Sequence, residues 1–218
     1  AELCNLISSA LSDCGLSRDQ FTINVSNRKI VQGLIDDLKI SEEKKIKVIR
    51  AIDKLDKPGF GLKGVEDLLQ KERKDQSGAI TKGADLTNDQ VAKILNFLKM
   101  KDLKELKENL KNPLSQEGIK ELEEVFEVIR YGSNSSQVKT NFTIVRGLAY
   151  YSDFILETNL NFKVTNNKGK RVDLGSICSG GGYAKLISRF KGVDVPGTGI
   201  SFGIDRLLFA LIQLDQIK

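Results

Sequence analysis

Two glycine-rich segments leave room for a ligand to approach the backbone. Gly180, Gly181 and Gly182 are consecutive where a strand is expected to end, and the absence of Cβ atoms allows close contact. In residues 197–206, glycines alternate with other residues along an apparent strand that runs into a helix. Such a strand offers a flat face to a purine, and Arg206 in the first helical turn could reach a phosphate. Tight packing of a helix on the strand explains the same glycines about equally well.

A third segment combines a permanent cation with two phenols. Arg146 follows a candidate strand and is itself followed by Gly147 and then by Tyr150 and Tyr151. A guanidinium at a strand end could bind a carboxylate or a phosphate. On this segment alone, an arginine in a salt bridge beside two packed tyrosines is the slightly better explanation.

The composition narrows the chemistry that these segments can perform. The 218 residues include no histidine, which excludes an imidazole base and hence Ser-His-Asp and Cys-His mechanisms. The three cysteines, Cys4, Cys14 and Cys178, are odd in number and form no CxxC pair. We therefore expect neither a disulfide framework nor a structural metal site. The net charge of +5 is compatible with RNA binding but does not demand it.

The sequence carries no visible targeting or membrane signal. No apolar run approaches the roughly 18–20 residues that span a bilayer, and no basic region precedes an apolar run near Ala1. A reducing cytoplasm is the simplest location for such a chain. The first residue is not methionine, which suggests a processed or excised segment.

Hydrophobic periodicity divides the chain into three stretches. Residues 1–40 predict a helix, a strand and a helix, residues 41–137 are rich in charge with helical periodicity only, and residues 138–218 return to strands. We predict an α+β fold in which an antiparallel sheet, from the first and last stretches, is interrupted by an all-helical insertion at 41–137. Within the insertion, Thr87 to Gln90 fits a capping box, and Ser115 is expected to cap a further helix.

Strand boundaries in the last stretch follow from alternation and turn signals. Residues 138–145 are a candidate strand, and the alternation at 154–164 predicts one long strand. The turn signal at 166–169 then folds the chain back through 172–178 as an antiparallel hairpin. A final helix is expected around 204–212.

Together, the three chemical segments resemble the histidine–tRNA ligases, a family of class II aminoacyl-tRNA synthetases. Two are similar to the family's histidine-specific motifs and one to the third class II motif, in the family's order and spacing: 146–151, 180–186 and 197–206. Residues 21–24 and 27–29 also resemble the family, and residues 51–57 resemble alphaproteobacterial members most. The resemblance covers nearly the whole chain and implies a partial class II catalytic core.

The resemblance implies that the chain's cations serve adenylate formation. Arg146 would be the catalytic residue, contacting the histidine carboxylate and the ATP α-phosphate, and Arg206 would hold the γ-phosphate. ATP would be a substrate, accompanied by Mg²⁺, and the histidyl group would pass to tRNA(His). This chemistry needs positioning and cationic stabilisation more than a protein base, so the lack of histidine is no obstacle. Both guanidinium groups are expected to converge over the glycine-cleared strand face.

The resemblance also implies a histidine pocket with an open floor. Tyrosines would line the pocket, with Tyr151 near the imidazole, and glycines would keep the floor free of side chains. The tyrosines are Tyr150, Tyr151 and Tyr183; Gly181 belongs to the histidine pocket, and Gly199 and Gly203 to the ATP site.

The chain departs from the family's pattern at several positions. Gly182 and Ala184 stand where the family usually has Arg and Asp, and Ala149 stands where an acidic residue is common. Residues 152–154 replace a usual Thr-Gly continuation. The first two class II motifs and the anticodon-binding domain are absent from the 218 residues. We therefore expect negligible aminoacylation by this chain alone. A homodimer is expected for the complete ligase and is uncertain for this chain.

Two other functions remain open at this level. A regulatory subunit of ATP phosphoribosyltransferase shares this fold without charging tRNA, and the residues at Gly182 and Ala184 slightly favour it. The basic insertion, which lies near the tRNA acceptor arm in the ligases, argues against it. The third possibility is an RNA-binding module without catalysis, which predicts strong salt-dependent RNA affinity in residues 41–137 alone.

Overall fold

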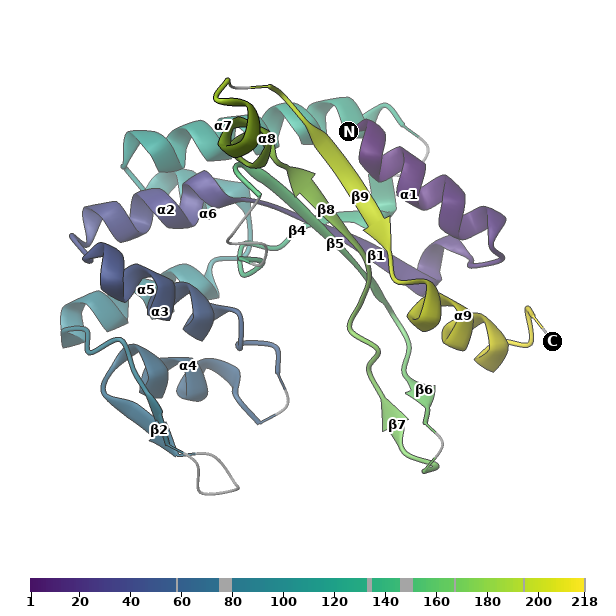
Figure 1. Ribbon diagram of the computed structural model, residues 1–218, viewed down its shortest axis with the longest axis horizontal. Helices are drawn as coiled ribbons and strands as arrows, with labels where there is room; N and C mark the ends of the chain where they lie inside the picture. The colour runs from purple at the N-terminus through teal and green to yellow at the C-terminus, as the bar shows by residue number, and fades with distance from the viewer. Residues whose placement is uncertain are drawn as a thin grey trace. The chain divides into compact units, whose positions relative to one another are not determined.

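The computed structural model describes residues 1–57, 59–74, 80–132, 135–145, 151–166, 168–193 and 195–217 (Figure 1). The chain divides into two compact units. One comprises Ala1–Ser26, Glu121–Asn141 and Ala149–Lys218, and the other comprises Asn27–Lys120 and Phe142–Leu148. The domain boundaries expected from the sequence stay a prediction, because these units reflect compactness and not independent folding.

The described chain alternates between helices and short strands. The helices are α1 (Glu2–Asp13), α2 (Arg28–Asp37), α3 (Glu42–Ile52), α4 (Gly61–Leu69), α5 (Asn88–Lys99), α6 (Leu103–Asn109), α7 (Pro113–Arg130), α8 (Ala184–Lys191) and α9 (Ile204–Gln213), with 3-10 turns η1 (Arg18–Gln20) and η2 (Ser135–Gln137). The strands are β1 (Phe21–Asn27), β2 (Glu72–Lys74), β3 (Ile80–Lys82), β4 (Val138–Thr140), β5 (Phe154–Leu160), β6 (Val164–Thr165), β7 (Arg171–Val172), β8 (Ser176–Gly182) and β9 (Thr198–Phe202). The helices predicted at both ends of the chain are confirmed. None of the helices in the described ranges is long and apolar enough to cross a membrane.

A five-stranded sheet in the order β4-β1-β5-β8-β9 organises the first unit (Figure 1). The predicted antiparallel pairing is confirmed for β5, β8 and β9. It is wrong for β4, which pairs with β1 in parallel. The reason is the long helical connection between these two strands, which acts as a crossover and returns the chain in the same direction.

Two strand predictions in the last stretch are too long. The strand expected at 138–145 ends at Thr140. The strand expected at 154–164 ends at Leu160, and β6 is a separate element. The pairing of β5 with β8 shifts register between Thr158 and Asn159, which interrupts the regular alternation expected for one long strand. In addition, the neighbouring residues Ile155 and Leu156 of β5 are both buried.

In the described residues of the 41–137 stretch that belong to the second unit, the regular structure is helical apart from a two-stranded hairpin of β2 and β3. The all-helical prediction is therefore wrong at this point. Each strand has three residues, and the described β3 side chains are exposed, so the apolar alternation that marks a half-buried strand is missing. Lys82 lies opposite Glu72, a favourable charge pairing across the hairpin.

The predicted helix cap at Ser115 is also wrong. Pro113 occupies the first position of α7, and the side chain of Asn112 caps the helix by accepting a 2.9 Å hydrogen bond from the Leu114 amide. The Ser115 hydroxyl instead donates to the Ile30 carbonyl at 2.9 Å, which ties α7 to α2. Proline is favoured at the first position of a helix, so the cap lies at Asn112, three residues earlier than the sequence pattern suggested.

The capping box predicted at Thr87 is confirmed at the start of α5. The Gln90 backbone amide donates to the Thr87 hydroxyl at 3.3 Å, and the Thr87 backbone amide donates to the Gln90 side chain at 3.0 Å.

Replacing Thr87 with alanine should lower the free energy of unfolding by about 1 kcal/mol, because one backbone amide of the first turn of α5 loses its acceptor. Urea unfolding measures this. The control Thr87→Ser keeps the hydroxyl and should cost only a few tenths of a kcal/mol; an equal loss in both variants would contradict the capping explanation.

Candidate functional site

Two glycines face each other on neighbouring strands. Gly181 of β8 lies directly opposite Gly199 of β9, and opposite residues of antiparallel strands share a face of the sheet. A Cβ atom on Gly181 would lie 2.5 Å from the Phe154 carbonyl oxygen and 2.9 Å from Cδ1 of Tyr151. A Cβ atom on Gly199 would overlap the Tyr183 hydroxyl. Both glycines are therefore required for the two tyrosine rings to rest on the strands.

The two tyrosine rings stack on each other above this face. The centroids of Tyr151 and Tyr183 are 6.3 Å apart, and the ring planes differ by 26°. Backbone hydrogen bonds hold both ends of the arrangement: the Tyr183 amide donates to the Gly197 carbonyl at 2.8 Å, and the Ser152 amide donates to the Gly182 carbonyl at 2.7 Å. Both rings stay half-buried, so part of each remains available to a ligand.

Arg206 lies in the first turn of α9 and is exposed. Its Nη1 donates to the Ser176 carbonyl at 2.6 Å, at the start of β8. Gly203, which precedes α9, donates its amide to the Ile177 carbonyl at 2.8 Å. A Cβ atom on Gly203 would meet the Ile177 oxygen at 3.5 Å and Cδ of Arg206 at 3.8 Å, which are ordinary contacts. In contrast to Gly199, this glycine is not required by its neighbours.

The structure thus brings together four of the residues predicted for the site: Tyr151, Tyr183, Gly181 and Gly199. Arg146 and Tyr150 lie outside the described residues. The expected convergence of Arg146 with Arg206 therefore stays a prediction.

Three polar residues share the face of the glycine pair and were not singled out from the sequence. Glu157 of β5, Ser179 of β8 and Ser201 of β9 are cross-strand neighbours, two positions along from the glycines. They are exposed or half-buried. The sequence does contain a pattern that could have pointed to them: a serine lies two residues from a glycine in both strands, at 179/181 and 199/201. The face therefore combines two tyrosine rings with a few polar groups, a combination that is common in ligand-binding sites.

Comparisons with known proteins identify the family. A family model described as histidyl-tRNA synthetase matches residues 1–207. The chain belongs to the histidyl-tRNA synthetase family. Histidine–tRNA ligase from Pelagibacter ubique (strain HTCC1062) is 75% identical over all 218 residues of this chain and 47% of its own length. The corresponding ligase of Rhizobium rhizogenes (strain K84 / ATCC BAA-868) is 39% identical, with 45% of its length covered. The chain thus spans about half the length of these relatives.

Solved structures give the same family fold. The crystal structure of histidyl-tRNA synthetase from Nostoc sp. PCC 7120 superimposes with a TM-score of 0.77 at 29% identity, covering 100% of this chain and 47% of that one. An ATP phosphoribosyltransferase regulatory subunit/histidyl-tRNA synthetase from Bacillus halodurans has a TM-score of 0.72 at 21% identity, covering 96% and 48%. The second likeness concerns the fold alone. The predicted family and fold class are confirmed.

Gly182 stands where an arginine is expected in this family. A Cβ atom there would lie 3.6 Å from the Ser152 hydroxyl and 4.0 Å from the Gly197 carbonyl oxygen. A Cβ atom at this position would therefore make only ordinary van der Waals contacts in this structure. The contacts around position 182 therefore do not require a glycine.

The opposite face of β8 carries a buried thiol. Cys178 is 2% exposed, and burial raises its pKa to about 12; burial also raises the pKa of Cys4, whereas Cys14 is exposed. The unfolded chain, with a thiol pKa of about 8.5, loses this proton first as the pH rises. The stability that the neutral Cys178 thiol contributes is therefore complete below that value and is lost as the pH rises toward about 12.

At pH 8, we expect iodoacetamide to modify Cys14 and to leave Cys4 and Cys178 unmodified, because the thiolate is the nucleophile and burial suppresses it. Peptide mass spectrometry after timed quenching measures this. In denaturant all three should react at similar rates. Rapid labelling of Cys178 in the folded chain would contradict its burial.

Proposed function

We propose that the Tyr151–Tyr183 site binds histidine for its activation by ATP, and that the activated histidine is transferred to tRNA(His). The observation that carries this proposal is the fit of two stacked tyrosines over Gly181 and Gly199. A neutral imidazole has one donor and one acceptor nitrogen, and a phenol can serve either. Two phenols over a small-residue face therefore suit the recognition of an imidazole ring.

The proposed reaction begins with attack of the histidine carboxylate on the ATP α-phosphorus, which releases pyrophosphate and leaves histidyl adenylate. The ribose hydroxyl of tRNA then takes the histidyl group and AMP leaves. In this scheme Arg146 contacts the carboxylate and the α-phosphate, and Arg206 the γ-phosphate. Gly199 and Gly203 belong to the ATP side of the site. Mg²⁺ would be held largely by the ATP phosphates, as is usual for this ion.

Histidine-dependent exchange of labelled pyrophosphate into ATP tests the proposal in a full-length ligase carrying these residues. Tyr151→Phe removes one phenolic hydroxyl and should raise the KM for histidine about tenfold, because an imidazole nitrogen loses its partner. The KM for ATP should stay unchanged. Exchange that does not depend on histidine, or equal changes in both KM values, would contradict the assignment of Tyr151 to the histidine pocket.

The acceptor, assembly and location of the complete protein form part of the same proposal. Membership of the family and the 75% identity to a histidine–tRNA ligase support tRNA(His) as acceptor, a homodimer and a cytoplasmic setting. The regulatory subunit of ATP phosphoribosyltransferase is the second candidate, favoured by Gly182 and Ala184. It predicts histidine binding without pyrophosphate exchange, which the same assay detects.

A further inference from the structure

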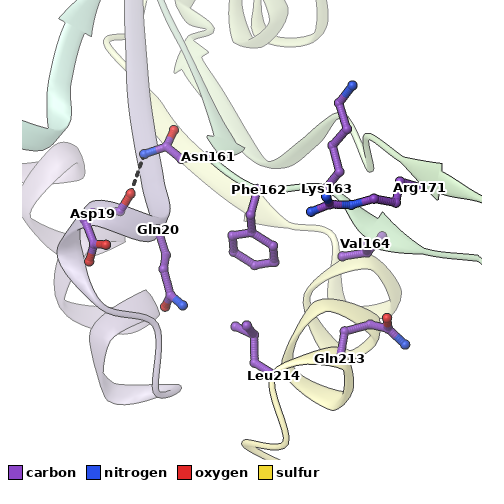
Figure 2. Close-up of a pocket in the computed structure, with 9 residues that line it drawn as sticks. All are labelled: Asp19, Gln20, Asn161, Phe162, Lys163, Val164, Arg171, Gln213 and Leu214. Carbon is purple, nitrogen blue, oxygen red and sulfur yellow. Dashed lines mark hydrogen bonds between the residues drawn. The ribbon is translucent and has the colours of Figure 1, made fainter.

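A second site lies at the far end of β5 from the tyrosine pair. A pocket of about 370 Å³ opens where the β6–β7 hairpin leaves the sheet (Figure 2). Its walls come from η1, from the link between β5 and β6, from β7 and from the end of α9. The volume falls within the range of small-molecule sites, roughly 300–1,000 Å³. The proposed histidine chemistry does not use this pocket.

Hydrogen bonds hold the walls of the pocket in place. The Asn161 amide donates to the Gln20 carbonyl at 2.8 Å, and its side chain donates to the Asp19 carbonyl at 2.7 Å. At the other side, the Thr165 amide donates to the Gln213 side chain at 3.3 Å. Three separate segments of the chain are thus fixed around one space, so the pocket is formed before any ligand arrives.

The hairpin wall of the pocket is cationic. Lys163 and Arg171 both line it and both are exposed (Figure 2). Lys168 and Lys170 follow on the same hairpin, so residues 163–171 contain four cations and no acidic residue. Across the described ranges, no salt bridge joins any of the four to a carboxylate. Their charges therefore remain available to an anionic ligand.

The interior and the opposite wall offer complementary groups. Figure 2 shows the Phe162 ring pointing into the pocket between the η1 wall and the α9 wall. The ring is half-buried, so one surface can stack on a flat ligand. Asp19 lines the wall away from the hairpin, and a hydrogen bond from Ser17 lowers the pKa of its carboxyl, which keeps it charged. A ligand with a phosphate at one end and a base amino group at the other matches this polarity.

We propose that this pocket binds one nucleotide of an RNA strand, with the base on Phe162 and the flanking phosphates on Lys163 and Arg171. A strand is favoured over a free nucleotide because Lys168 and Lys170 lie on the same hairpin but outside the lining of the pocket, and so extend the cationic surface beyond it. A membrane surface fits less well, since the described hairpin residues include no exposed large apolar side chain to insert. This site goes beyond the proposed function.

Fluorescence anisotropy with a labelled single-stranded RNA of about 12 nucleotides tests this site in the 218-residue chain. The double variant Lys163→Gln/Arg171→Gln should weaken binding about tenfold and lower the slope of log K against log salt by about 1.4, since each lost phosphate contact contributes about 0.7. Phe162→Leu keeps an apolar side chain but removes the stacking surface. It should weaken binding about tenfold with the salt slope unchanged.

The matched control is Arg130→Gln/Lys139→Gln, which removes one arginine and one lysine from exposed positions elsewhere in the same compact unit. Retained affinity in this control supports the pocket. Wild-type affinity in the hairpin variant, or an equal loss in the control, would overturn the proposal. AMP binding as tight as that of RNA, or hairpin-dependent binding to phosphatidylserine vesicles in place of RNA, would also overturn it. Histidine binding, measured on the same variants, should not change, so failure here is distinguishable from failure of the proposed function.

Discussion

Replacing Arg206 with glutamine is expected to lower histidine-dependent pyrophosphate exchange about a thousandfold. Transfer at phosphorus depends on positioned cations more than on a protein base, and this chain has no histidine to act as one. The guanidinium is oriented by its 2.6 Å hydrogen bond to the Ser176 carbonyl at the start of β8. Glutamine could still reach toward that carbonyl, but it brings no charge to the γ-phosphate. Steady-state exchange in a full-length ligase measures the loss.

Arg206→Lys is the matched variant for this experiment. It keeps the charge but loses the planar fork that can bond the Ser176 carbonyl and a phosphate together, so it should recover no more than about a tenth of the activity. Because Arg206 is exposed, neither variant should move the thermal midpoint by more than a few degrees. Normal exchange by Arg206→Gln would remove this residue from the proposed mechanism.

Gly199→Ala is expected to lower the affinity for histidine about a hundredfold. The new methyl group would occupy the position of the Tyr183 hydroxyl, so the ring must move away from the strand and from its 6.3 Å stack on Tyr151. Small displacements of positioning groups are costly because the ligand's contacts depend on a defined geometry. Calorimetric titration with histidine measures the change, and circular dichroism tests whether the sheet remains folded.

Two controls isolate the steric cause. Gly182→Ala adds the same methyl group one strand away, where the nearest atom would be 3.6 Å distant, and should change histidine affinity less than twofold. The double variant Gly199→Ala/Tyr183→Phe removes the overlapping hydroxyl and leaves Cζ at 3.0 Å as the nearest atom. It should bind histidine as well as Tyr183→Phe alone. Additive losses would show that the glycine acts by some route other than Tyr183.

The fold could be predicted where side-chain periodicity reports directly on burial. The helical repeat of Leu3, Ile7 and Leu11 predicts α1, and Thr87 with Gln90 marks the start of α5. The β2–β3 hairpin could not be predicted, because the described β3 side chains are all exposed and show no alternation of apolar and polar residues. The parallel pairing of β4 also escaped, because strand direction depends on the path of the intervening helices rather than on the strand's own residues.

The linear order of residues was enough to identify the family, because three motifs in fixed order carry the resemblance. It also shows that these 218 residues contain no histidine. It could not distinguish glycines that are sterically necessary from those that are merely tolerated. That difference depends on what packs against each position: Tyr183 occupies the space over Gly199, while a Cβ atom on Gly182 would make only ordinary contacts. The same holds for the pocket at Phe162, whose walls come from segments far apart in the chain. The periodicity of apolar residues indicates which face of a segment is buried and which is exposed to solvent. Contacts between segments that are distant in the sequence form only when the chain folds.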